Sequence, residues 1–184
     1  MKRVGFAENC EARITNVEYA PESTTFEIEG ERYVLPLNGE FNVRNGAMAI
    51  TAARFGGLSA DEIRGALLAF SGIKRRQEVR GVTDRNITVI DDFGHHPTAI
   101  REAITGLRRK YEGSRMWAIF EPRSNTTRRN VFQEALPEAL GQADAVCIAA
   151  VARADQLDVE ERLDTDLMME TLRAGGKPAY YEPD

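Results

Sequence analysis

The sequence feature that most constrains the fold is a junction between an apolar run and a helix-like segment near the middle of the chain. The mostly apolar run 87–90 is followed by the polar octapeptide Asp91-Asp92-Phe93-Gly94-His95-His96-Pro97-Thr98 and then by segment 99–110. Proline suits the first turn of a helix, where its missing N–H group costs nothing. The junction therefore predicts a strand, a polar turn and a helix, with both histidines of the chain at the carboxyl end of the strand. Ligands bind at that end of the strands in open α/β sheets.

The alternation of strand and helix continues after this junction. The apolar pattern predicts helices at 97–111, 128–140 and 164–174, and strands at 115–120, 143–150 and from 179 onward. Pro137 is expected to end or kink the second of these helices. Two further strands, 77–81 and 87–91, bracket a turn at 83–86. Strands that alternate with helices of this length are typical of βαβ units with a mostly parallel sheet.

The first part of the chain follows a different pattern. Short apolar runs at 12–17, 25–28 and 33–37 predict antiparallel strands, with a hairpin turn at Glu29-Gly30-Glu31. A helical period follows at 42–55 and ends at Gly56-Gly57. Ser59 and Glu62 have the spacing of a capping box for a further helix, which Ser71-Gly72 ends. We place a domain boundary there, so that residues 1–72 and 73–184 form separate domains.

Composition restricts the class of function. The net charge of −5 and the pI of about 5.3 argue against a general nucleic-acid-binding protein, which needs a basic face. No apolar run approaches the ~20 residues that span a bilayer, and no signal peptide is recognisable, so we expect a cytoplasmic protein that does not bind membranes. Cys10 and Cys147 fit no metal-binding or disulfide spacing and are interpreted as reduced thiols.

Glycine-rich phosphate-binding patterns are missing from the sequence. No Gly-x-x-x-x-Gly-Lys-Ser/Thr segment occurs, and residues 174–178 are interpreted as a turn that ends a helix before a strand. No Gly-x-Gly-x-x-Gly segment follows a strand either. The sequence therefore gives little support to a dehydrogenase that binds a dinucleotide.

Four stretches resemble, in order and spacing, the Mur ligases, which build bacterial cell-wall precursors. They are residues 39–47, residues 70–78, the octapeptide 91–98 and the segment Phe120-Glu121-Pro122-Arg123-Ser124-Asn125-Thr126. The last segment resembles the branch that joins UDP-N-acetylmuramate to the recycled tripeptide L-alanyl-γ-D-glutamyl-meso-diaminopimelate. The alanine-adding branch shares the octapeptide but has a histidine-arginine-tyrosine type sequence at positions 123–125. The resemblance covers nearly the whole chain, from about Ile14 onward.

The resemblance implies an α/β fold in two parts. Residues 73–184 would form a Rossmann-like, mostly parallel sheet that is truncated at its end. Residues 1–72 would form the last part of the family's central ATPase domain, with short antiparallel strands and two helices but without the phosphate loop. The chain would then be a fragment, inactive in isolation, of a ligase that is a monomer when complete.

The implied reaction is ATP-dependent formation of an amide bond through an acyl phosphate. ATP and Mg²⁺ are the implied cofactors, with the main Mg²⁺ ligands outside the fragment. UDP-N-acetylmuramate and the murein tripeptide are the implied substrates. The alternatives are the alanine-adding ligase and a non-catalytic module that binds a nucleotide or a peptide.

Asn42, Asn45, Arg76 and Asp92 are candidates for nucleotide binding. From the residues alone, Asn42 is interpreted as a helix cap and the run 74–76 as a solvated cationic segment. The resemblance implies that the first asparagine lies against the adenine and that Arg76 faces the nucleotide. It also implies that Asp92 accepts hydrogen bonds from the ribose hydroxyls, a role that suits an acceptor-only carboxylate.

His95 and His96 are candidates for catalytic residues. A metal site is disfavoured, because adjacent histidines on a turn point apart and no third ligand has a suitable spacing. One imidazole can hold the nucleotide-binding loop while the other faces the reacting groups. Imidazoles titrate near neutral pH, so either one is able to accept a proton from an incoming ammonium group.

The candidates for recognition of the acceptor peptide follow two successive strands. Arg123, Ser124, Asn125 and Thr126 come after the first strand and are expected to open a helix, whose N-terminus attracts anions. A structural cap explains much of this pattern, but the arginines favour a peptide that carries several carboxylates. Arg153 follows the next strand and is a further candidate. We expect these loops, Asp92 and the two histidines to share one cavity.

Overall fold

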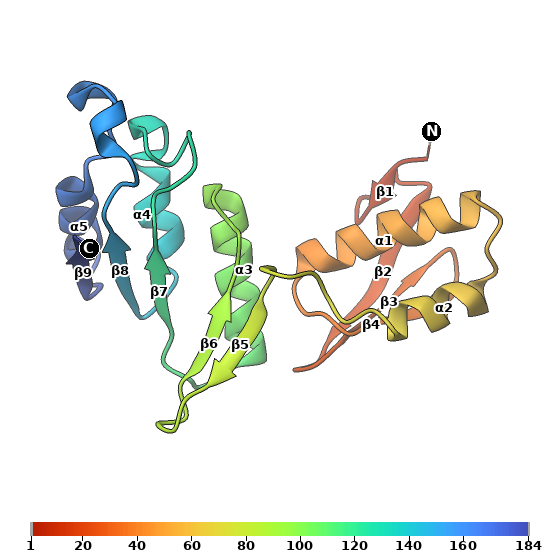
Figure 1. Cartoon of the computed structure of the whole chain (residues 1–184). Helices are drawn as coiled ribbons and strands as arrows, with labels where there is room; N and C mark the ends of the chain where they lie inside the picture. The colour runs from red at the N-terminus through yellow and green to blue at the C-terminus, as the bar shows by residue number, and fades with distance from the viewer. Residues whose placement is uncertain (1, 184) are drawn as a thin grey trace. The chain divides into compact units, whose positions relative to one another are not determined.

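The chain folds into two compact units, each with its own hydrophobic core (Figure 1). The computed structural model describes residues 2–183. The first unit contains the chain up to Asp92 together with Gly106–Glu112. The second unit contains Phe93–Thr105 and the chain from Gly113 onward. Within residues 2–183, no helix combines the length and the apolar character that crossing a membrane requires.

The first unit is built on a four-stranded sheet with the order β1-β2-β3-β4. These strands are β1 (Val4–Gly5), β2 (Ala12–Tyr19), β3 (Thr24–Ile28) and β4 (Glu31–Leu35). The antiparallel pairing of β2, β3 and β4 is as predicted, whereas the short parallel pair of β1 and β2 was not expected. Glu29 and Gly30 have φ values of 51° and 79°, the left-handed backbone that a two-residue hairpin loop requires.

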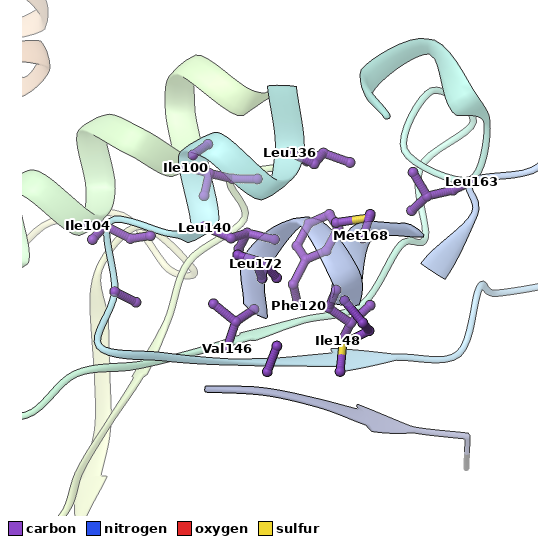
Figure 2. Close-up of a cluster of buried hydrophobic side chains, with 14 residues drawn as sticks. Ile100, Ile104, Phe120, Leu136, Leu140, Val146, Ile148, Leu163, Met168 and Leu172 are labelled. Atoms are coloured by element: carbon purple, nitrogen blue, oxygen red, sulfur yellow. The ribbon is translucent and has the colours of Figure 1, made fainter. Parts of the chain in front are cut away.

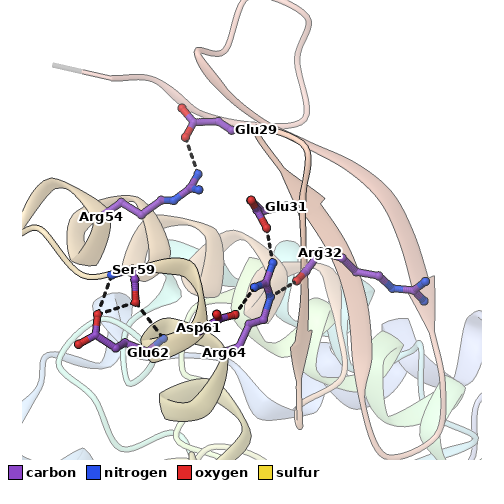
Figure 3. A network of polar contacts seen from close by, with 8 residues as sticks. All are labelled: Glu29, Glu31, Arg32, Arg54, Ser59, Asp61, Glu62 and Arg64. Carbon is purple, nitrogen blue, oxygen red and sulfur yellow. Dashed lines mark hydrogen bonds and ion pairs between the residues drawn. The ribbon is translucent and has the colours of Figure 1, made fainter.

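Helices α1 (Glu40–Phe55) and α2 (Ala60–Leu68) pack on this sheet (Figure 1). Their buried apolar side chains contact the inward face of the strands; they are Val43, Ala47, Ile50 and Ile63, packed with Phe26, Tyr33 and Leu35. The predicted capping box is confirmed, because the Ser59 hydroxyl accepts from the Glu62 N–H at 3.4 Å and Glu62 accepts from the Ser59 N–H at 2.8 Å (Figure 3). Local polar chemistry thus fixes the start of α2.

Arginines attach both helices to the hairpin of β3 and β4 (Figure 3). Arg64 on α2 donates to the Arg32 carbonyl at 3.1 Å and also pairs with Glu31. Arg54 on α1 pairs with Glu29 at 2.7 Å. These contacts add directional bonds to a packing that is otherwise apolar.

Glu62 gives the first unit a pH-dependent contribution to stability. Hydrogen bonds from the hydroxyl and N–H groups of Ser59 lower the pKa of Glu62 below the ordinary value of 4.5. Stability from such a carboxyl is present above its unfolded pKa and is lost as the pH falls through its folded pKa. We expect Glu62→Gln to lower the melting temperature at neutral pH and to have a shrinking effect below pH ~4. Thermal unfolding across pH measures this, with exposed Glu170→Gln as the control. An effect of Glu62→Gln that does not change with pH would contradict the assignment.

An antiparallel hairpin and a long helix follow. Strands β5 (Glu78–Val82) and β6 (Thr88–Asp91) pair across the predicted turn at 83–86. Helix α3 (Pro97–Lys110) starts at the proline, as the junction in the sequence predicts.

The second unit is built on a parallel sheet with the order β7-β8-β9. Its strands are β7 (Trp117–Phe120), β8 (Ala145–Ala149) and β9 (Ala179–Glu182). Helices α4 (Ala135–Leu140) and α5 (Thr165–Ala174) alternate with them, which confirms an α/β fold with a parallel sheet. Figure 2 shows the core between the helices and the sheet, including Phe120, Leu136, Val146, Ile148, Met168 and Leu172.

The predicted helix at 128–140 is wrong in its first half. Arg129 is extended, with φ −105° and ψ 160°, and a single 3₁₀ turn (Asn130–Phe132) precedes α4. Pro137 neither ends nor kinks the helix, because it lies in the first turn of α4, where its missing N–H group has no helical partner to lose. The segment between β7 and α4 is therefore mostly loop.

Candidate functional site

Carboxylates at the end of β6 hold the segment that precedes β5. Asp92 accepts a hydrogen bond from the Gln77 N–H at 3.0 Å, and Asp91 pairs with Arg75 at 3.3 Å. Glu78 accepts from the Arg75 N–H at 2.8 Å, and this bond lowers the pKa of Glu78 below its ordinary value. Asp92 therefore has a structural role in the first unit, while the contact with ribose that the family resemblance implies stays a prediction.

Asn42 does not cap α1, so that prediction is wrong. The helix starts at Glu40, and its N-cap is Gly39, with φ 101° and no side-chain cap bond. Gly39 adopts this backbone without strain, and the helix therefore begins before Asn42. The Asn42 amide instead donates to the Asn38 carbonyl at 2.7 Å, while Asn45 is exposed on the next turn.

A small pocket of about 40 Å³ lies beside these contacts in the first unit. Asn38 and Gln77 are among its lining residues, so Asn42 and Asp92 flank it through their hydrogen bonds to those two residues. Arg76 is exposed next to Gln77. The pocket is far below the ~300 Å³ of ordinary small-molecule sites, so it has room for water and not for a nucleotide.

Gln77 is a polar residue of this region that the sequence pattern missed. Its Nε2 is buried and has no hydrogen-bond partner, although it lines the pocket. A buried donor of this kind is costly unless water or a ligand satisfies it. Its position directly before β5, between Arg76 and Glu78, is the only signal that the sequence offered.

His95 and His96 make different local contacts in the second unit. The Nδ1 atom of His96 lies 3.3 Å from the Thr98 nitrogen. An N–H group must donate, so Nδ1 accepts and the proton of the neutral ring is on Nε2. The same ring lies against Phe132, with 4.8 Å between the ring centroids. His96 thus caps the first turn of α3.

The His95 ring has the opposite tautomer. Its Nδ1 lies 3.2 Å from the Phe93 carbonyl oxygen, which only accepts, so Nδ1 carries the proton. The Nε2 atom of this exposed ring is then the acceptor. The suggestion that one histidine holds a loop while the other faces the reacting groups stays a prediction, and these contacts favour His95 for the second role.

Residues 124–128 form a tight turn where the sequence predicts the start of a helix. The Ser124 N–H donates to the Thr127 hydroxyl at 3.1 Å, and the Thr127 N–H donates to the Ser124 hydroxyl at 3.1 Å. Each hydroxyl therefore accepts a hydrogen bond from the backbone N–H of the other residue. The segment does not form the predicted helix N-terminus, because α4 begins only at Ala135. Asn125 and Thr126 are exposed at the tip of the turn.

The loops after β7 and β8 are connected directly. The Ala152 N–H donates to the Pro122 carbonyl at 3.0 Å, which joins the segment of Arg123 to the segment of Arg153. Arg123 has 72% of its side chain exposed and lies 3.7 Å from Glu121. Arg153 is also exposed and has a left-handed backbone with φ 51°. The structure thus brings the candidates for peptide recognition to one edge of the sheet.

The single cavity predicted for the whole set stays a prediction. Asp92, Asn42, Asn45 and Arg76 belong to the first unit, whereas the histidines, Arg123 and Arg153 belong to the second. In the part of the chain that the structure describes, no group of three or more His, Cys, Asp or Glu side chains is arranged to hold a metal ion. Mg²⁺ in nucleotide sites usually takes one or two protein carboxylates together with substrate phosphates, so the ligands of this ion stay a prediction.

Comparison with known proteins identifies the family. The protein-family model described as "Mur ligase, glutamate ligase domain" matches residues 75–184. The chain belongs to the Mur ligase family. This confirms the resemblance seen in the sequence, while the predicted domain boundary at Gly72 stays a prediction.

Curated relatives include two kinds of Mur ligase. The UDP-N-acetylmuramate–L-alanyl-γ-D-glutamyl-meso-2,6-diaminoheptanedioate ligase of Escherichia coli K12 is 45% identical over 111 residues, which are 60% of this chain and 24% of that protein. The UDP-N-acetylmuramate–L-alanine ligase of Ruegeria pomeroyi is 33% identical over 186 residues, which cover 97% of this chain and 39% of that protein. This Mur ligase chain thus spans about a quarter to two-fifths of the length of these relatives.

Solved structures show the same fold. A murein peptide ligase from Psychrobacter arcticus has a TM-score of 0.65 and 27% identity, and the match covers 99% of this chain and 38% of that one. A UDP-N-acetylmuramate–alanine ligase from Thermotoga maritima has a TM-score of 0.79 over 98% of this chain and 39% of that one. Its identity of 22% supports the fold alone.

Proposed function

We propose that this chain supplies nucleoside-side and acceptor-peptide contacts of an ATP-dependent ligase. The ligase joins UDP-N-acetylmuramate to L-alanyl-γ-D-glutamyl-meso-diaminopimelate. The observation that carries the proposal is the 45% identity with the Escherichia coli ligase named for that acceptor. The arginine-containing loops after β7 and β8 support it, because this acceptor carries several carboxylates and guanidinium groups bind carboxylates well.

The proposed reaction activates the muramoyl carboxylate as an acyl phosphate, with ATP as the source of the phosphoryl group. The amine of the tripeptide's alanine then attacks, and a tetrahedral intermediate collapses to the amide and phosphate. This chemistry depends mainly on positioning and on stabilisation of charge. In this chain, Arg123 and Arg153 would orient the acceptor, and the free Nε2 of His95 would accept the proton that the ammonium group loses.

On the nucleotide side, the proposal keeps Asn42, Asn45, Arg76 and Asp92 as contacts of ATP. The hydrogen bond from Gln77 to Asp92 supports a defined orientation of that carboxylate before the ribose arrives. Asn42 is likewise held by its bond to Asn38. Acceptors and donors that are already held in place reduce the conformational entropy that is lost on binding.

An alanine acceptor is the second candidate. It is favoured by relatives of the alanine-adding kind, which match almost the whole chain at 31–33% identity. Alanine offers one carboxylate and no remote charges, so it would leave the exposed arginines of these loops without a ligand.

The choice of acceptor tests the proposal. A ligase that contains this chain is incubated with ATP, Mg²⁺ and UDP-N-acetylmuramate, and phosphate release is measured with tripeptide or with alanine. We expect kcat/KM to be about tenfold or more higher for the tripeptide, because only it provides the additional charged contacts. Preference for alanine would support the second candidate, and binding of nucleotide or peptide without amide formation would support a non-catalytic module.

A further inference from the structure

Arg128 is a buried cation without an anionic partner. Only 8% of the residue is exposed, although arginine is among the residues that are rarely buried unless paired. Within residues 2–183, two carboxylates of these loops pair with other arginines, Glu161 with Arg129 and Glu121 with Arg123. No ion pair joins Arg128 to any carboxylate in this described range. The hydrogen-bond acceptors that Arg128 contacts are two backbone carbonyls and one amide oxygen, all of them neutral.

The donors of this guanidinium are incompletely satisfied. Its Nη2 donates to the amide oxygen of Asn125 at 2.7 Å. Its Nη1 has only two long contacts, 3.4 Å to the Ala152 carbonyl and 3.5 Å to the Arg153 carbonyl. Its Nε is buried and has no partner. Burial without a counter-charge is unfavourable, and a carboxylate with two oxygens would relieve it.

The backbone of Arg128 is fixed on both sides. Its N–H donates to the Ser124 carbonyl at 3.0 Å, and its carbonyl accepts from the Leu163 N–H at 3.0 Å. The neighbouring Thr127 is fully buried. The guanidinium therefore lies at the junction of the loops after β7 and β8, where it contacts the carbonyls of Ala152 and Arg153.

We propose that Arg128 binds a carboxylate of the acceptor peptide. This carboxylate takes the place of the Asn125 amide oxygen as the acceptor for Nη2. Nε and Nη2 lie on one edge of the guanidinium, so a carboxylate on that edge makes two parallel hydrogen bonds. The exposed Asn125 accepts a hydrogen bond from Nη2 and none from Nε. Its amide oxygen therefore occupies part of the position of the proposed carboxylate without supplying a charge. The identity of the anion rests on the proposed function, whereas the demand for an anion rests on the geometry alone.

A built-in carboxylate tests the demand for an anion. Asn125→Asp places a negative charge at the position of the present amide oxygen, 2.7 Å from Nη2. We expect its melting temperature to exceed that of the unchanged chain by several degrees, because the buried cation gains a partner. We also expect the tripeptide affinity, measured by calorimetry, to fall about tenfold or more, since the site is filled. A melting temperature that falls or does not change would overturn the proposal.

A pair of neighbouring arginines provides the matched comparison. Arg128→Gln and Arg129→Gln remove the same charge one residue apart, but Arg129 already pairs with Glu161. We expect the affinity for the tripeptide to fall about tenfold or more in Arg128→Gln and by less than about twofold in Arg129→Gln. Equal losses would overturn the role of Arg128 and leave the proposed function intact. If the unchanged chain binds no tripeptide, the proposed function and the identity of the anion fail together, and the melting temperature of Asn125→Asp still decides whether Arg128 requires an anion.

Discussion

Replacement of Leu136 by alanine is expected to lower the free energy of unfolding of the second unit by about 3 kcal/mol. The Leu136 side chain is completely buried in the first turn of α4, in the cluster that contains Phe120, Leu140 and Met168. Figure 2 shows it beside α4, in the same cluster as Met168. Removal of its terminal carbons loses the transfer free energy of that apolar surface and leaves a cavity that rigid neighbours fill only in part. Urea denaturation followed by circular dichroism measures the change.

Leu167→Ala is the control for Leu136→Ala. Leu167 lies on α5 in the same unit and has 46% of its surface exposed, so the same deletion removes few contacts. Alanine is the best helix former, so neither change weakens its helix through propensity. We expect Leu167→Ala to change the free energy of unfolding by less than about 1 kcal/mol. Equal losses for the two substitutions would show that Leu136 is not packed in the core of the second unit as described.

Replacement of Arg123 by alanine is expected to reduce the affinity for the tripeptide by about ten- to a hundredfold while the chain stays folded. The side chain is 72% exposed, and its ion pair with Glu121 is long at 3.7 Å. Exposed pairs of this kind contribute little to stability, so the substitution has a small structural cost. A carboxylate of the bound acceptor would instead lose a guanidinium partner.

Arg85→Ala is the control for Arg123→Ala, because Arg85 is also exposed but lies in the turn between β5 and β6. We expect it to bind the tripeptide with unchanged affinity, as measured by calorimetry, and both variants to keep the melting temperature of the unchanged chain within a few degrees. An unchanged affinity in Arg123→Ala would remove this residue from the acceptor site. A large fall in melting temperature would show that the residue is structural.

Local sequence patterns predicted most of the regular elements. The Glu29-Gly30 turn, the capping box of Ser59 and the proline start of α3 each depend on residues that specify the backbone by themselves. The alternation of strand and helix after Gly72 also predicted a mostly parallel sheet, which β7, β8 and β9 form, whereas β5 and β6 form a separate antiparallel pair. In these cases the local preference and the tertiary packing favour the same structure, and a prediction from sequence succeeds.

The failures have local and long-range causes that helical periodicity does not reveal. Ser124 and Thr127 close a turn with their own hydroxyls, so helical periodicity after residue 128 did not lead to a helix start there. Gly39 allowed α1 to start before Asn42. The unpaired charge of Arg128 could not be found from sequence, because it depends on long-range neighbours such as Ala152 and Leu163.

The central claim is that the loops after β7 and β8 form the site of the acceptor peptide. Titration of the ¹⁵N-labelled chain with L-alanyl-γ-D-glutamyl-meso-diaminopimelate, followed by amide-resolved NMR, tests it most directly. The account predicts saturable shifts concentrated in residues 121–129 and 150–158, together with weaker or no shifts when alanine is added instead. Shifts that lie elsewhere in the chain, or that alanine reproduces at the same concentration, would contradict it.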